Sequence, residues 1–141
     1  MSGEQPYDFS QAKAAQREAS TRQRAAEQFV IDSWKGYAEA ERAYRAALAA
    51  KIVELKAGGM AVTACADVAR GEPAVAALKH RRDIAEGVRE AAGQAAWRAS
   101  ADRKAEQSFL EWSARKDIAE TYQPPTHDDP RFAPVSGATH A

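Results

Sequence analysis

The chain has 141 residues, enough for one domain of ordinary size. Its 20 Lys and Arg residues balance its 20 Asp and Glu residues, so no net charge attracts it to nucleic acid or to a membrane. The single cysteine, Cys65, excludes an intramolecular disulfide. Because the chain shows no secretory signal and no run of roughly 20 apolar residues, we expect a cytoplasmic protein that does not span a membrane.

The first predicted element is a long helix from Phe9 to Ala57, which follows a polar and loose start at residues 1–8. Alanine makes up about a quarter of the chain, a composition typical of long helices and coiled coils. Apolar residues follow at helical steps of three and four, which predicts one apolar face. They are Phe29, Val30, Trp34, Tyr37, Tyr44, Leu48, Ile52 and Leu55.

The doublet Gly58-Gly59 ends this helix, because glycine adopts the left-handed conformation needed just past a helix C-terminus. Thr63 is expected to cap a short helix from Ala64 to Arg70. Pro73 suits the first turn of the next helix, where its missing N–H costs nothing. Residues 58–73 are therefore predicted to form a small folded tip.

A second long helix is predicted from about Ala74 to Tyr122 and is expected to pair antiparallel with the first. This pairing would place Leu78 and Ile84 near Leu55 and Leu48. The alanine-rich stretch 91–99 would then face the large aromatic residues of the first helix. These are Trp34, Tyr37 and Tyr44.

The last segment, residues 123–141, holds four of the six prolines and is expected to be a disordered tail. The predicted fold is thus all-α: a long, coiled-coil-like antiparallel helical hairpin with a short helical tip. Thin alanine-rich helices bury little apolar area, so we expect a homo-oligomer. The expected oligomer and packing residues are Trp34, Tyr37, Tyr44, Trp97, Phe109 and Trp112.

The sequence offers little to catalysis. Its histidines are scattered, and no phosphate-binding glycine loop occurs, so we expect no enzyme, cofactor or metal. Three glycines, Gly36, Gly87 and Gly93, interrupt the helices, where each costs about 1 kcal/mol against alanine. We expect them to mark the close approach of a neighbouring helix.

Basic residues gather at the tip, and between positions 51 and 82 six Lys or Arg face three Asp or Glu. Such a patch could bind the phosphates of single-stranded nucleic acid or an acidic protein surface. The alternative is a solvated face whose charges compensate one another. The candidate binding residues are Arg70, Lys79, Arg81 and Arg82.

Residues 37–92 resemble a group of short helical proteins encoded by tailed phages and prophages. The shared pattern is Y-x-x-A-E-x-x-Y-R, then G-M-x-V-T, A-R-G-[DE] and R-D-x-A-E. It falls on Tyr37, Ala40, Glu41, Tyr44 and Arg45, on Gly59, Met60, Val62 and Thr63, on Ala69, Arg70, Gly71 and Glu72, and on Arg82, Asp83, Ala85 and Glu86. The resemblance implies that the gene lies near early phage genes for replication and recombination.

The leading hypothesis is a non-enzymatic phage accessory protein, an oligomeric hairpin that binds a partner such as single-stranded nucleic acid. Two alternatives remain open. The chain could be a structural component of the virion head, neck or tail, or an inhibitor of a host protein.

Overall fold

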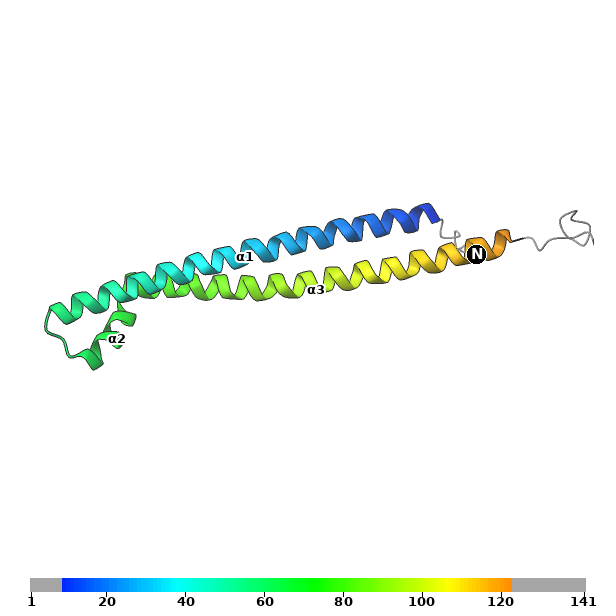
Figure 1. Cartoon of the computed structure of the whole chain (residues 1–141). Helices are drawn as coiled ribbons and strands as arrows, with labels where there is room; N and C mark the ends of the chain where they lie inside the picture. The colour runs from blue at the N-terminus through cyan, green and yellow to red at the C-terminus, as the bar shows by residue number, and fades with distance from the viewer. Residues whose placement is uncertain (1–8, 123–141) are drawn as a thin grey trace, which may run out of the picture.

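The computed structural model describes residues 9–122, which form three α-helices and no strand. Helices α1 (Phe9–Ala57) and α3 (Pro73–Thr121) each have 49 residues, and α2 (Val62–Gly71) has 10. α1 and α3 lie antiparallel and side by side, with α2 at the closed end (Figure 1). The predicted all-α hairpin with a helical tip is confirmed. The predicted loose start and proline-rich tail lie outside the described residues.

The glycine doublet ends α1 as predicted. Gly59 has a φ of 86°, in the left-handed region. The N–H of Met60 donates to the carbonyl of Leu55 at 3.1 Å, and the N–H of Gly59 donates to that of Lys56 at 3.0 Å. These two bonds define a Schellman motif, which satisfies the last carbonyls of the helix.

The prediction of Thr63 as a helix cap is wrong. α2 begins at Val62, after Ala61, and no side chain caps it. The chain leaves the Schellman turn already extended at Ala61, so the helix can begin one residue later without a polar cap. Cys65 and Ala69 are completely buried, which shows that α2 docks on the hairpin through small side chains.

Buried and half-buried side chains recur at alternating steps of four and three residues along both long helices. This is the heptad pattern of a coiled coil, and we call these positions the seam. On α1 the seam residues are Ala12, Gln16, Ala19, Gln23, Ala26, Val30, Ser33, Tyr37, Ala40, Tyr44, Ala47 and Lys51. On α3 they are Val75, Leu78, Arg82, Ala85, Arg89, Ala92, Ala96, Ala99, Arg103, Glu106, Leu110 and Ser113.

The seam is thin and partly polar. Every second seam position of α1 is alanine or serine, and α3 contributes three arginines. Of the seam residues, the apolar ones that are buried are Ala12, Ala19, Tyr44, Val75 and Ala92. Since each buried methylene contributes only about 0.8 kcal/mol, alanines supply little hydrophobic stabilisation.

Three polar contacts fix the register of the two long helices. Lys51 Nζ lies 3.8 Å from Glu72 Oε2, and Arg82 Nη1 lies 3.4 Å from Glu41 Oε2. Nearer the open end, Gln16 Nε2 lies 3.4 Å from Gln107 Oε1. Each step along α1 between these contacts matches an equal step along α3, so the register is constant along the hairpin.

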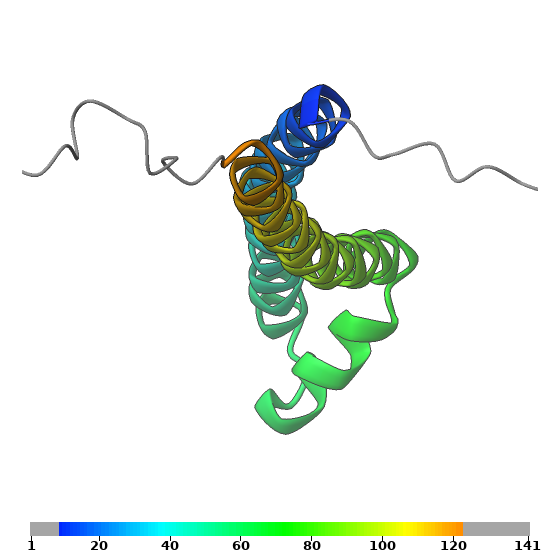
Figure 2. The same cartoon turned by 90° about the vertical axis from the view of Figure 1, so that its right-hand side faces the viewer.

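This register corrects the predicted pairing. Lys51 meets Glu72, just before α3 begins, so the last turn of α1 extends past the start of α3 and lies above α2 (Figures 1 and 2). Leu48 is therefore level with the start of α3 rather than with Ile84, which is half exposed. The prediction assumed a symmetrical turn, whereas α2 folds back beside α1 and shifts the register.

Candidate interaction surfaces

The basic residues predicted at the tip are largely compensated. Arg70 Nη1 lies 3.0 Å from Asp67 Oδ1, and Lys79 Nζ lies 3.1 Å from Asp83 Oδ2. Arg82 Nη2 lies 2.6 Å from Asp83 Oδ1. Of the four candidate residues, only Arg81 has no ion pair among the described residues.

Arg82 belongs to the seam rather than to a free basic surface. Its guanidinium lies 5.0 Å from the centre of the Tyr44 ring and contacts Glu41, which, like Tyr44, belongs to α1. Arg45 donates a hydrogen bond to Glu41, which lowers the pKa of that carboxyl, and the charge of Arg82 lowers it further. Hydrogen bonds from Arg82 and Lys79 likewise lower the pKa of Asp83.

A second arginine, Arg89, holds two of the predicted packing aromatics. Its guanidinium lies 4.3 Å from the centre of the Trp34 ring and 4.4 Å from that of Tyr37. Cation–π contacts of this kind contribute about 0.5–2 kcal/mol. The prediction that the alanine stretch 91–99 faces Tyr37 and Tyr44 is therefore wrong. Arg89 contacts Tyr37 and Arg82 contacts Tyr44, and both arginines lie nearer the tip than the alanine stretch.

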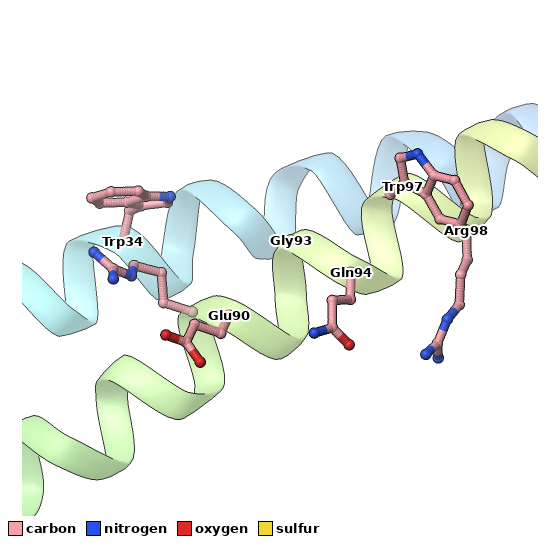
Figure 3. A pocket seen from close by; sticks show the side chains of 7 residues that line it. Trp34, Glu90, Gly93, Gln94, Trp97 and Arg98 are labelled. Carbon is pink, nitrogen blue, oxygen red and sulfur yellow. The ribbon is translucent and has the colours of Figure 1, made fainter.

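A hollow of about 710 Å³ lies beside Trp34, on one flank of the seam. Figure 3 shows Gly93 on α3 between the indoles of Trp34 and Trp97. Trp34 is 54% exposed and Trp97 is 74% exposed. Arg98 also lines this open hollow, as do Arg89, Glu90 and Gln94. The arrangement is an apolar floor with charged sides.

The predicted close approach at the three interrupting glycines does not occur among residues 9–122. A Cβ atom added at Gly36, Gly87 or Gly93 would have no atom of another helix within 4 Å. The seam explains why, since none of the three occupies a seam position.

The remaining predicted aromatics lie near the open end of the hairpin. Phe109 and Trp112 have ring centres 5.7 Å apart, and Lys116 Nζ lies 5.5 Å from the centre of the Trp112 ring. Trp112 is 56% exposed. Of the six predicted packing residues, only Tyr44 is buried.

Within residues 9–122, no group of three or more His, Cys, Asp or Glu side chains is placed to hold a metal ion. The helices described there also lack a segment long and apolar enough to cross a bilayer. Cys65 is buried, and its thiol donates to the Met60 carbonyl at 3.7 Å.

Comparison with known proteins gave no match to a family model, to a curated protein or to a solved structure. The surfaces described above must therefore be interpreted from their own chemistry.

The sequence reasoning missed Arg89, Glu90 and Arg98. A heptad count would have found Arg89, because Arg82, Arg89 and Arg103 recur at multiples of seven residues on α3. Glu90 and Arg98 carry no such signal, and only their position beside the two indoles distinguishes them.

Proposed function

We propose that this chain is a non-enzymatic, self-associating helical hairpin that binds a partner, acting as a cytoplasmic phage accessory protein. The phage context rests on the resemblance of residues 37–92 to short tailed-phage proteins. The self-association rests on the distribution of apolar side chains in the hairpin.

The observation that carries the proposal is an inversion of the usual burial. The seam buries mainly alanines, whereas three tryptophans lie more than half exposed. Exposed aromatic residues on a soluble protein mark surfaces that bind other chains. Covering them would supply the apolar burial that a two-helix hairpin lacks.

Sedimentation equilibrium of the full chain from about 1 to 100 μM tests self-association. The expected result is a dimer or higher oligomer whose population rises with concentration. A monomer over the whole range would overturn the proposal. Trp97→Ala is expected to weaken the association, whereas Tyr122→Ala, which removes another exposed aromatic just after α3, is not.

The tip offers a second candidate surface, for phosphates or for an acidic protein. Lys56, in the last turn of α1, and Arg81, about two turns into α3, are exposed and have no ion pair among the described residues. Fluorescence anisotropy of a labelled single-stranded oligonucleotide across a salt series tests it. Binding that weakens steeply with salt, and is lost in Lys56→Ala/Arg81→Ala but kept in Arg24→Ala in the half of α1 farther from the tip, would support it. Arg82 is unsuitable for this test, because its loss would disturb the seam.

Recovery of the chain in purified particles at a fixed stoichiometry would instead select a virion component. Copurification of one host protein from infected cells would select an inhibitor of that protein. Either outcome would replace the accessory role while leaving the self-association to be judged by sedimentation.

A further inference from the structure

Gly93 lies within the 49-residue helix α3, and no contact with another described residue requires a glycine there. Glycine there costs about 1 kcal/mol against alanine. Apart from the neighbouring backbone of α3 itself, nothing lies within 4 Å of a Cβ built at this position. The same residue lies between two exposed indoles in the hollow described above (Figure 3). A bare backbone between aromatic walls is suited to receive a large side chain from outside.

Two charged residues beside this hollow, Glu90 and Arg98, lie on opposite sides of Gln94 and have opposite signs. Glu90 and Arg98 lie one helical turn on either side of Gln94, and all three share one face of α3. Neither Glu90 nor Arg98 has an ion pair among the described residues. Glu90 therefore places an acidic charge on the tip side of Gln94, and Arg98 places a basic charge on the open-end side.

A surface with this pattern complements a copy of itself. A two-fold axis places the same patch on both subunits, so a residue before the axis meets one equally far behind it. With the axis at Gln94 and the two α3 helices antiparallel, Glu90 of each copy meets Arg98 of the partner subunit. A parallel arrangement would instead place Glu90 beside its own copy, which repels.

We propose that a second copy of this chain docks antiparallel on this face, across a two-fold axis at Gln94. Trp97 of each copy enters the hollow over Gly93 of the other, and Glu90 lies opposite Arg98 of the partner subunit. This inference rests on the proposed self-association and gives it a specific geometry.

Charge reversal tests the geometry by sedimentation equilibrium. Glu90→Arg and Arg98→Glu are each expected to raise the dissociation constant about tenfold or more, because each places like charges together. The double variant Glu90→Arg/Arg98→Glu is expected to return to within about threefold of the wild type. Single variants without effect, or a double variant weaker than either, would overturn this geometry while the self-association stands. A monomeric wild type would overturn both.

Disulfide cross-linking provides an independent readout. In Gln94→Cys the two new thiols lie at the axis and are expected to form a covalent dimer under mild oxidation. Ala101→Cys is the matched control, since it lies two turns away on the same exposed face. Antiparallel copies place its thiols roughly 20 Å apart, too far to bridge. The wild type, with only buried Cys65, measures background oxidation.

Efficient cross-linking of both variants would indicate parallel copies, and cross-linking of neither would place the interface elsewhere. Both outcomes would overturn the proposal. Circular dichroism of each variant confirms that the helices remain folded.

Discussion

Arg82 of α3 contacts both Glu41 and Tyr44 of α1, with its Nη1 atom 3.4 Å from Glu41 Oε2 and its guanidinium 5.0 Å from the Tyr44 ring centre. One side chain thus provides an ion pair and a cation–π contact within the seam. Neither contact exists unless the helices pair in this register. Arg82 therefore helps to specify register in a seam whose alanines would pack almost equally well one heptad away.

Tyr44→Ala is expected to destabilise the hairpin by about 3 kcal/mol, because Tyr44 is the largest buried apolar side chain of the seam. Urea denaturation followed by circular dichroism measures this. Tyr122→Ala removes an exposed ring and is expected to change stability by less than about 0.5 kcal/mol. Equal losses in the two variants would contradict the assignment of Tyr44 to the seam.

Ala92→Leu is expected to destabilise the hairpin by about 1–3 kcal/mol, since Ala92 is completely buried and the small side chain allows α1 and α3 to approach closely. Ala77→Leu places the same side chain at an exposed position of α3 nearer the tip and serves as the control. Thermal unfolding at equal protein concentration compares them. A tolerated leucine at Ala92 would mean that the helices are not in close contact there.

Gly59→Ala and Gly58→Ala are expected to change stability in opposite directions. The left-handed φ of Gly59 strains any L-residue, so this substitution should cost about 1 kcal/mol. Gly58 has no positive φ, and a Cβ there meets only ordinary contacts of 3.5 and 3.6 Å. Alanine at Gly58 should therefore stabilise by about 0.5 kcal/mol through the unfolded chain. The midpoints of urea denaturation of the two variants and the wild type test both predictions. A destabilised Gly58→Ala variant would contradict the Schellman assignment.

Acid is expected to weaken the hairpin through Glu41 and Asp83. The pKa of each carboxyl is lower in the folded chain than its ordinary value, 4.5 for Glu41 and 3.8 for Asp83. A lowered folded pKa stabilises the fold above the ordinary value, and this stabilisation is lost as pH falls through the folded pKa. The melting temperature should therefore decline below about pH 4.5.

Glu41→Gln isolates the part of this decline that depends on Glu41. The variant should melt below the wild type at pH 7, and the difference should shrink as the pH falls below 4.5. Glu39→Gln is the control, because Glu39 is exposed and has no ion pair among the described residues. If the difference in melting temperature between Glu41→Gln and the wild type stayed constant with pH, the stabilisation by Glu41 would not depend on its ionisation.

The helix bounds could be predicted from the sequence, because the signals that set them are local. The α1 bounds were predicted correctly, α3 was placed within one residue, and Pro73 begins α3 as expected. The start of α2 was not predicted correctly. Thr63 is a residue type that often caps helices, but the chain is already extended at Ala61 after the Schellman turn, so α2 begins before Thr63.

The candidate surfaces were less predictable. The sequence identified the tryptophans as oligomer and packing residues but could not separate the two roles, because apolar periodicity cannot distinguish a seam position from its flank. It also treated the tip arginines as one patch, although Arg82 points into the seam and Arg70 pairs with Asp67. Side chains adjacent in sequence can leave a helix in different directions, and only the partner helix decides which are covered.

The sequence by itself determined that this chain forms two long helices joined by a folded tip, because alanine, glycine and proline act on the backbone within a few residues. The tertiary structure decided the register, which depends on how α2 folds back beside α1. That register places Arg82 against Tyr44 and Arg89 against Tyr37, and it leaves Trp34 and Trp97 exposed around Gly93. Register is a property of two helices together, so no local pattern in either one contains it.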